Sequence, residues 1–171
     1  MVICPSDVNC PKIDKDKTMQ KKIITTPWIP YPVILFDGFC NLCDRSINLI
    51  IQKDPEKHFR FVALQSEAGV FLQKHWSIPP ETDSVILCEN GTLYFQSEAF
   101  LRIVKRLHFP WNLAITGWIM PQFLRDHIYR RIARHRYNWF GKRGYCRIPD
   151  KDERERFLSI DELQLIFTIK P

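Results

Sequence analysis

The sequence lacks the features that would mark a membrane or secreted protein. It has no run of about 18 or more apolar residues, and its longest apolar stretch, residues 109–124, is interrupted by polar residues and two prolines. Residues 1–30 contain no continuous apolar segment typical of a secretory signal, and Asp7, Asp14 and Asp16 argue against an acid-poor transit peptide. We therefore predict a cytoplasmic protein without a membrane span.

The sequence also lacks the ligand pattern of a structural zinc site. Six cysteines are present, but only Cys40 and Cys43 form a C-x-x-C pair, and no H-x-x-x-H pattern occurs. Because zinc takes four ligands, a zinc half-site would need Cys88, Cys146 or the scattered histidines to complete it. The irregular cysteine spacing does not require a disulfide framework. We expect no metal and no cofactor other than a redox-active disulfide.

Positive charge is concentrated in one part of the chain. The formal net charge is +6, and residues 120–147 contain eight basic residues and one acidic residue. The rest of the chain is therefore nearly neutral. With 171 residues and 45% hydrophobic content, the chain can bury one sizeable core.

The apolar pattern divides the chain into four segments. Residues 1–32 mix charged residues and prolines without periodicity, which predicts a flexible N-terminal tail. Residues 33–108 alternate between strand and helix patterns and form the predicted core. Residues 109–149 are predicted to be a basic helical appendage packed on that core, and residues 150–171 a C-terminal tail.

The core segment shows the pattern of an α/β fold. Residues 33–36 and 59–64 are predicted strands, joined by a helix that ends at Asp54-Pro55, which indicates a parallel β-α-β unit. Two further strands, residues 84–88 and 92–95, flank the hairpin turn Asn90-Gly91. The order β-α-β-α-β-β-α is that of a thioredoxin-like four-stranded mixed sheet with flanking helices. The appendage adds predicted helices over residues 111–119 and 122–137.

The tetrapeptide Gln-Ser-Glu-Ala occurs twice, at residues 65–68 and 96–99. Each copy follows a predicted strand and precedes a helical pattern. Ser66 and Ser97 are typical N-cap residues, whose side chains accept a hydrogen bond from a free amide of the first helical turn. We interpret the repeat as two similar helix starts and not as a duplicated module.

Cys40 and Cys43 lie where the first strand of the core passes into its first helix. A cysteine at this position faces unpaired amides and the positive end of the helix dipole, which stabilise a thiolate. The i, i+3 spacing also permits a disulfide between the two residues. We predict a redox dithiol in which an exposed Cys40 attacks a substrate disulfide and Cys43 resolves the mixed disulfide. A zinc half-site and two structural thiols are the alternatives.

Asp37 lies three residues before Cys40 and has two candidate roles. As a proton acceptor it would make the buried Cys43 thiol nucleophilic. As a turn residue it would bond loop amides around Gly38. The neighbouring charge of Arg45 favours a thiolate at Cys40, although the adjacent Asp44 opposes it.

Two other cysteines have separate interpretations. Cys88 alternates with apolar neighbours in a predicted strand and is expected to be a buried, inert thiol. Cys146 lies at the end of the appendage, where it either approaches the dithiol as a third redox group or is a structural cysteine. We take Cys146 as an accessory site residue together with Arg45, Gln65 and Ser66.

Residues in both halves of the chain resemble the DCC family of thiol-disulfide oxidoreductases, named for an Asp-x-x-Cys-x-x-Cys motif. The resembling residues are 36–43, 64–66, 83–85 and 97–99 in the core and Arg125-Asp126, Tyr129, Ala133, Arg136-Tyr137, 139–141, Cys146 and Pro149 in the appendage. The resemblance covers roughly residues 33–158. It implies a thioredoxin-like fold, a dithiol site of Asp37, Cys40 and Cys43, and a thiol or disulfide substrate that is either a protein or a small molecule.

Two features depart from better known thioredoxin-like enzymes. Asn41-Leu42 replaces the Gly-Pro or Pro-Tyr type of dipeptide between the cysteines, and no proline directly precedes the predicted strand at residues 84–88. Peptide binding in the usual groove is therefore not implied.

The basic appendage supports a different hypothesis, a nucleic-acid-binding module. Guanidinium groups contact phosphates and aromatic rings stack on bases, and the residues of these types are Arg130, Arg131, Arg134, Arg136, Tyr129, Tyr137, Trp139, Phe140 and Tyr145. Against this hypothesis, Leu124, Ile128 and Ile132 are predicted to form a buried stripe on the same helix, so that some of these arginines only cover the apolar body or pair with the acidic residues of 150–155. A third interpretation is that the charge attracts an acidic partner or a small thiol such as glutathione.

Overall fold

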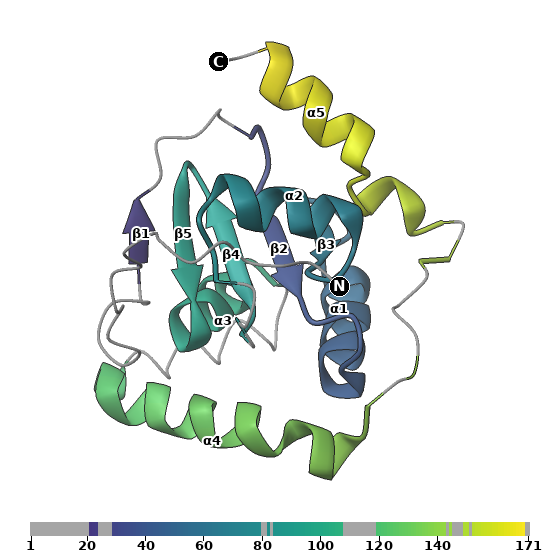
Figure 1. Cartoon of the computed structure of the whole chain (residues 1–171). Coiled ribbons are helices and arrows are strands. Elements are labelled where there is room, and N and C mark those ends of the chain that lie inside the picture. The colour runs from purple at the N-terminus through teal and green to yellow at the C-terminus, as the bar shows by residue number, and fades with distance from the viewer. Residues whose placement is uncertain are drawn as a thin grey trace, which may run out of the picture.

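A central mixed sheet organises the chain. The structure, a computed structural model, describes residues 21–23, 29–79, 82, 84–107, 119–142, 144, 149–150 and 152–169. Five strands lie in the order β1-β5-β4-β2-β3 (Figure 1). They are β1 (Lys21–Ile23), β2 (Val33–Phe36), β3 (Arg60–Ala63), β4 (Ile86–Glu89) and β5 (Thr92–Phe95).

The strand pairing follows from the local sequence. β2 and β3 pair in parallel and are joined by α1 (Asn41–Lys53), as the β-α-β pattern predicts. β4 and β5 form an antiparallel hairpin, whose turn residues Asn90 and Gly91 both have positive φ angles, 50° and 70°. β4 also pairs antiparallel with β2, which makes the sheet mixed. The predicted α/β fold class is confirmed.

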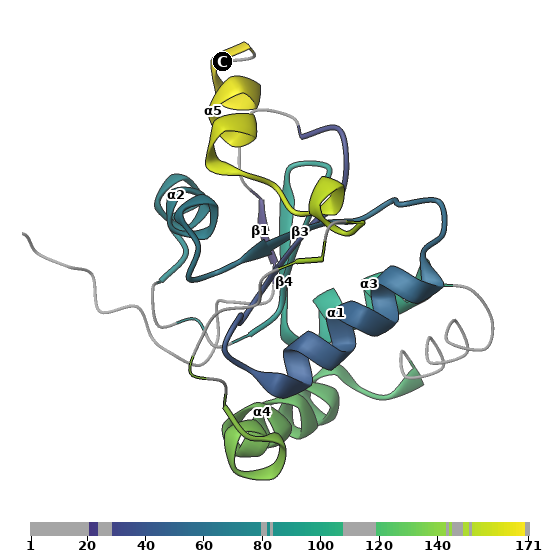
Figure 2. The same ribbon diagram turned by 90° about the vertical axis from the view of Figure 1, so that its right-hand side faces the viewer.

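Helices cover both faces of the sheet (Figure 2). α1 and α3 (Gln96–Lys105) lie on one face, and α2 (Glu67–His75) and α5 (Ile160–Ile169) lie on the other. Because side chains alternate along a strand, β2 serves both cores: Val33 and Leu35 join the core on the α2 side, while Ile34 and Phe36 join the core on the α1 side. The sheet therefore divides the hydrophobic core into two apolar layers, one on each face.

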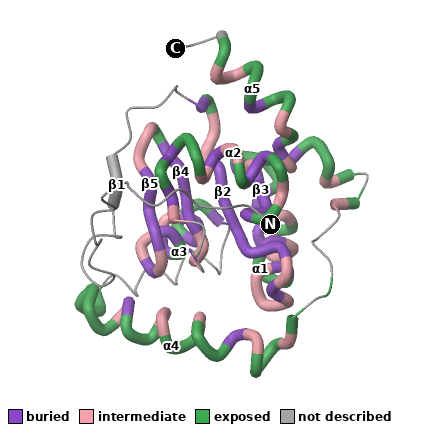
Figure 3. Tube along the Cα trace, in the orientation of Figure 1, coloured by how far each residue is buried: buried purple, intermediate pink, exposed green. Residues whose placement is uncertain are grey.

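α4 (Gln122–Phe140) packs against α3 and α1, yet most of its residues are exposed (Figure 3). Only two of its residues are buried, Asp126 and Arg136. The hydroxyls of Tyr129 and Tyr137 also contact the core. The prediction of a buried apolar stripe is wrong, because Leu124, Ile128 and Ile132 are each at least 40% exposed. The other predicted appendage helix, residues 111–119, lies outside the described residues except for Ile119.

Two segments predicted as tails contain ordered elements. β1 lies in the predicted N-terminal tail and pairs antiparallel with β5. α5 lies in the predicted C-terminal tail and packs on α2, with Leu163 completely buried in the core. The short length of β1 and the charged residues before α5 concealed both elements in the sequence.

Only one of the two Gln-Ser-Glu-Ala repeats caps a helix with its serine. Ser66 is the N-cap of α2, and its Oγ accepts a hydrogen bond from the Gly69 N–H at 3.1 Å. The prediction for Ser97 is wrong, because α3 begins at residue 96 and has no side-chain cap. The Ser97 hydroxyl instead donates to Asp126 and accepts from Arg125 Nε at 2.9 Å. Contacts with α4 therefore override the local capping preference.

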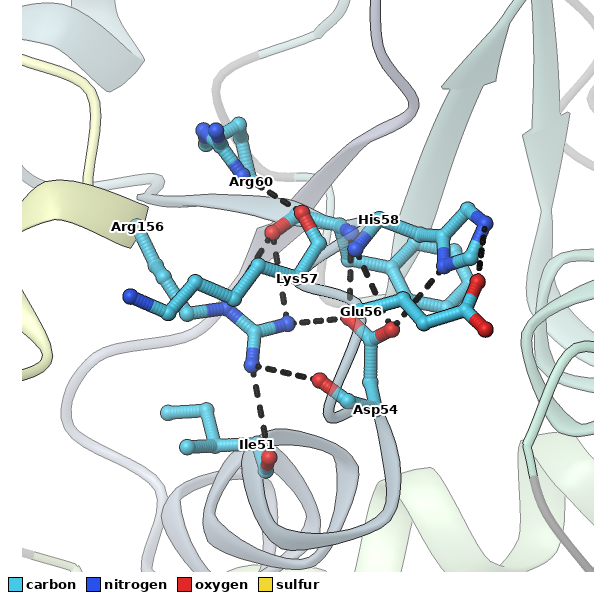
Figure 4. Close-up of polar contacts among 8 residues, drawn as sticks. Ile51, Asp54, Glu56, Lys57, His58, Arg60 and Arg156 are labelled. Carbon is cyan, nitrogen blue, oxygen red and sulfur yellow. Dashed lines mark hydrogen bonds and ion pairs between the residues drawn. The ribbon is translucent and has the colours of Figure 1, made fainter.

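A buried ion pair fixes the chain that follows α4 to the end of α1 (Figure 4). Arg156, in a short 3₁₀ helix at Arg154–Arg156, contacts the carboxylate of Asp54, the C-cap of α1. Asp54 also accepts the backbone N–H groups of His58 and Phe59, both at 3.1 Å. The next residue, Phe157, forms a parallel bridge with Phe61 at the free side of β3.

Among the described residues, no helix is long and apolar enough to cross a membrane.

Candidate functional site

Cys40 ends the loop after β2 and is the N-cap of α1. Its backbone is extended, with φ −88° and ψ 118°, and its Sγ accepts a hydrogen bond from the Cys43 N–H at 3.4 Å. The Cys40 N–H donates to the Asp37 carbonyl oxygen at 3.3 Å, which closes the turn between strand and helix. The Cys40 sulfur therefore lies at the positive end of the helix dipole, as the sequence predicts.

The pKa values of the two thiols shift in opposite directions. The hydrogen bond from the Cys43 thiol, helped by backbone amides and by the charge of Arg136, outweighs burial and lowers the pKa of Cys40 to about 6. The same thiol–thiol contact, together with burial and the charge of Cys40, raises the pKa of Cys43 well above its ordinary value. At neutral pH the pair therefore shares one proton, with the thiolate on Cys40 and the proton on Cys43.

Cys40 is completely buried, so the prediction that it is exposed enough to attack a substrate is wrong for this state. Its exposed fraction is 0%. The chain at the end of α4 covers it: Lys142 forms an antiparallel bridge with Cys40, and the Asn41 side-chain amide donates to the Phe140 carbonyl oxygen at 2.9 Å. We call residues 140–142 the α4 strap. Because the strap is 99 residues from Asn41 in the chain, no local pattern reveals this cover.

Cys43 is partly exposed and borders a cavity of about 510 Å³ between α1, α3 and α4. The cavity walls are mainly apolar, and α4 contributes Tyr129 and Arg136 to them. In this structure the sulfur that borders open space is therefore Cys43, whereas the sulfur with the lowered pKa is Cys40.

Asp37 is buried at the end of β2 and accepts four hydrogen bonds. Oδ1 accepts from the Phe39 N–H at 3.0 Å and from Gln65 Nε2 at 2.9 Å. Oδ2 accepts from Arg136 Nη2 at 2.8 Å and from the Tyr137 hydroxyl. The bond to Phe39 is the turn-stabilising role that the sequence allows for Asp37. Its role as a proton acceptor for the dithiol stays a prediction.

Arg136 and Tyr137 also belong to the site, because both donate to Asp37. The sequence did not predict a role for them beside the dithiol. Arg136 is only 3% exposed, and its guanidinium lies over the Tyr137 ring at 4.7 Å. Burial opposes its charge, but the hydrogen bond with Tyr137 and the nearby negative groups raise the pKa of Arg136 above its ordinary value. The apolar stripe contained the signal, since Arg136 follows Ile128 and Ile132 at the same spacing of four.

The predicted accessory residues differ in their distance from the dithiol. Gln65 belongs to the site, because its Oε1 accepts the Gly38 N–H at 2.9 Å in the loop before Cys40. Ser66 caps α2 and donates to the Ala63 carbonyl oxygen, so its contacts are with the helix start. Arg45 is exposed on α1. Cys146 lies outside the described residues.

The hydroxyl of Tyr129 accepts a hydrogen bond from the backbone directly before β4. The Val85 N–H, directly before β4, donates to the Tyr129 hydroxyl at 3.0 Å. Burial raises the pKa of Tyr129 to about 12, against the effect of this bond. A side chain of α4 therefore holds the backbone amide directly before β4.

Cys88 is buried in β4, as predicted, and the structure holds it as a free thiol. Burial raises its pKa to about 12, and the charge of Glu89 adds to the effect. Such a thiol is a poor nucleophile at neutral pH. Among the described residues, no cluster of three or more His, Cys, Asp or Glu side chains could hold a metal ion.

The arginines of α4 divide into two groups. Arg125 and Arg136 point into the protein and pair with Glu98 and Asp37, which removes them from a nucleic-acid surface. Arg131 and Arg134 are exposed, and Arg130 is partly exposed. Trp139 is 61% exposed and stacks on the His135 ring at 5.4 Å. The nucleic-acid alternative stays a prediction, limited to this outer face.

The fold and the C-x-x-C pair at the start of α1 define a thioredoxin-like protein with a dithiol. The chain belongs to the DCC1-like thiol-disulfide oxidoreductase family, whose sequence profile matches residues 34–142. This membership supports a redox role and a thiol or disulfide substrate.

The chain is also similar to two curated proteins. The chain is 39% identical over 136 residues to YuxK, an uncharacterized protein of Bacillus subtilis strain 168, covering 79% of this chain and 99% of the relative. It is 40% identical over 119 residues to a chloroplastic DCC family protein of Arabidopsis thaliana, covering 68% of this chain and 69% of the relative. No solved structure matches the chain.

Proposed function

We propose that this protein carries out thiol–disulfide exchange through Cys40 and Cys43, with Cys40 as the nucleophile and Cys43 as the resolving thiol. The observation that carries the proposal is the position of Cys40 as the N-cap of α1, with its Sγ 3.4 Å from the Cys43 amide nitrogen. A pKa of about 6 makes Cys40 a thiolate at neutral pH, which is the reactive form of a cysteine. The family membership points in the same direction.

The proposed cycle begins with displacement of the α4 strap, because the attacking sulfur must reach the substrate. The Cys40 thiolate then attacks one sulfur of the substrate disulfide, and the substrate S–S bond breaks as the mixed disulfide forms. The other half of the substrate leaves as a thiolate. Cys43 loses its proton to solvent and attacks the Cys40 sulfur, which releases the second substrate thiolate. Two electrons have then passed from the protein dithiol to the substrate, and Cys40 and Cys43 form a disulfide.

Asp37 has a positioning role in this scheme. All four acceptor positions of its carboxylate are in use, by a loop amide and by the side chains of Gln65, Arg136 and Tyr137. We therefore assign Asp37 to holding the loop before Cys40, with solvent as the acceptor of the Cys43 proton.

The stabilised thiolate also sets an expectation for the reduction potential. Interactions that lower the pKa of Cys40 stabilise the reduced form of the pair, and a stabilised reduced form makes a couple more oxidising. We expect the Cys40/Cys43 couple to be more oxidising than an unperturbed dithiol. Equilibration with glutathione redox buffers of increasing potential measures this value.

The test of the proposed function is trapping of the mixed disulfide. The probe is oxidised glutathione, and mass spectrometry of peptides identifies the modified cysteine. Cys43→Ser is expected to retain one glutathione on Cys40, while Cys40→Ser leaves Cys43 essentially unmodified. Cys88→Ser is the matched control and is expected to reduce glutathione disulfide at the rate of the unmodified protein. If Cys43→Ser carries no glutathione on Cys40, the proposed function is wrong.

A further inference from the structure

We propose that Arg136 of α4 is a positioning residue of the dithiol, and that its buried guanidinium supplies the positive charge that favours a thiolate at Cys40. This proposal rests on the proposed redox function and deepens it. It makes α4 a part of the redox site, although the sequence presents this helix as an appendage.

The C-terminal end of α4 is fixed over the start of α1. Lys142 bridges Cys40 and the Asn41 side chain holds the Phe140 carbonyl oxygen. The strap turns at Gly141, whose φ of 79° and ψ of 167° form a conformation that is essentially restricted to glycine. The last turn of α4 is therefore held at the start of α1 by contacts that directly follow Arg136 and Tyr137 in the chain.

The guanidinium is oriented by groups of the core and of its own helix. Arg136 Nη2 donates to Asp37 Oδ2 at 2.8 Å and to the Tyr137 hydroxyl at 3.0 Å. Both partners of the ion pair are buried, so water screens the charge poorly. Arg136 also lines the cavity that Cys43 borders. A fixed, buried cation therefore lies in the wall of the cavity that Cys43 borders.

Among the described residues, the other charged or titratable groups around the dithiol do not provide this positive charge. Asp37 precedes α1, and the buried Asp44 lies in its first turn; both are acidic. Tyr129 and Tyr137 of α4 have pKa values raised to about 12 by burial and stay neutral. Lys142 is exposed to solvent, and its Nζ lies 5.7 Å from the centre of the Phe39 ring and 5.5 Å from that of Tyr137. Arg136 is the cation whose charge lowers the pKa of Cys40 and also acts on Cys43.

The experiment measures the thiolate directly, by its ultraviolet absorbance as a function of pH, in the reduced protein. This readout does not require a reagent to reach the buried sulfur. Arg136→Gln keeps a hydrogen-bond donor but removes the charge, and we expect the midpoint to rise by about 1 to 2 units. The thiolate fraction at pH 7 then falls roughly two- to tenfold. Arg136→Lys, which retains the charge, is expected to restore most of the shift.

Two controls separate charge from folding. Arg131→Gln alters an exposed arginine of the same helix, and Arg156→Gln alters the other buried arginine, which pairs with Asp54 at the far end of α1. Both are expected to leave the thiolate midpoint unchanged. A folded Arg136→Gln protein with the midpoint of the unmodified protein would overturn the proposal.

A second variant keeps the proposal testable if Arg136→Gln does not fold. Asp37→Asn retains an amide oxygen that can accept from the Arg136 guanidinium but removes the facing anion, so the midpoint is expected to fall. An unchanged or higher midpoint in this variant contradicts the proposal. Failure of glutathione trapping on Cys40 together with a shifted midpoint in Arg136→Gln would reject the redox function alone. Trapping with an unshifted midpoint would reject the role of Arg136 alone.

Discussion

The two ends of α1 each hold a buried arginine–aspartate pair, and the pairs differ in their neighbours. At the start of the helix, Arg136 pairs with Asp37 across 99 residues of chain. At its end, Arg156 pairs with Asp54 across 102 residues. Each pair fastens a C-terminal segment to the core through the same two residue types.

The surroundings decide what each pair does. Arg156 donates to the backbone carbonyl oxygens of Ile51 and Asp54, which the end of the helix leaves free (Figure 4). It also donates to the Phe59 carbonyl oxygen. Burial lowers the pKa of Arg156, although the charge and hydrogen bond of Asp54 oppose the shift. Arg136 instead donates to the Tyr137 hydroxyl and lines the cavity that Cys43 borders. The Arg156–Asp54 pair therefore stabilises the fold, whereas we propose that the Arg136–Asp37 pair influences the chemistry of the dithiol.

The largest expected effect separates the two ends by stability. Arg156→Gln leaves Asp54 as a buried carboxylate without its cation, which costs about 3 to 5 kcal/mol of unfolding free energy. The thiolate midpoint of Cys40 stays where it was, because α1 separates the two pairs. Urea unfolding and the ultraviolet thiolate titration measure these two quantities. A shift of the midpoint in Arg156→Gln would show that the pair at the end of α1 also acts on the Cys40 thiolate.

The next effect concerns pH and belongs to the start of the helix. Thiols in the unfolded chain titrate near 8.5, whereas Cys40 in the folded protein titrates at about 6. Between these values the unfolded chain binds one more thiol proton, so the stability of the reduced protein rises with pH by roughly 3 kcal/mol. This stabilisation is lost as the pH falls through 6.

Cys43 reverses the trend in more alkaline solution. Its folded pKa is raised, so above about 8.5 the unfolded chain releases a proton that the folded protein keeps, and stability declines. Urea unfolding at each pH, with Cys40→Ser as the control, measures the profile. An equal rise in Cys40→Ser would mean that another group causes it.

A smaller effect is expected at the strap. Alanine at Gly141 must adopt a backbone conformation that costs about 1 to 3 kcal/mol, and its Cβ would lie 3.1 Å from Asn41 Nδ2. Gly141→Ala is therefore expected to loosen the strap and to speed alkylation of Cys40 at pH 7, while alkylation of Cys88 is unchanged. Timed iodoacetamide labelling with mass spectrometry follows both cysteines. Slower or equal labelling of Cys40 would show that the strap does not limit access.

The smallest effect is expected at an exposed ion pair near the end of α1. Lys57 and Glu155 form an ion pair at 3.1 Å, and both side chains are more than half exposed. Glu155→Ala is expected to change the unfolding free energy by less than about 0.5 kcal/mol, since surface pairs contribute little. A loss as large as that of Arg156→Gln would show that the outer pair, and not the buried one, fastens this segment.

Local sequence signals predicted the part of the site that local interactions form. The turn from β2 to α1 and the cap at Cys40 follow from Gly38, the C-x-x-C spacing and the apolar residues on each side. The hairpin turn at Asn90-Gly91 was likewise predicted from its own two residues. These features depend on residues within a few positions of one another, which is the range over which sequence patterns are informative.

The parts that the sequence did not predict depend on contacts between distant segments. Ser97 has the sequence of a cap, yet Arg125 and Asp126 of α4 engage its hydroxyl. Cys40 has the sequence of an exposed nucleophile, yet Lys142 covers it. The partner of Asp37 could not be chosen among eight basic residues between 120 and 147 from charge alone. Only the packing of α4 selects Arg136.

The bridge between Phe157 and Phe61 has a consequence for self-association. A strand at the border of a sheet presents backbone groups that can template pairing with another molecule. Here the Leu158 N–H donates to the Phe61 carbonyl oxygen at 3.1 Å, beside the Phe157 bridge. The segment after Arg156 therefore shields β3 from intermolecular strand addition, and the salt-linked turn that holds it also guards against aggregation.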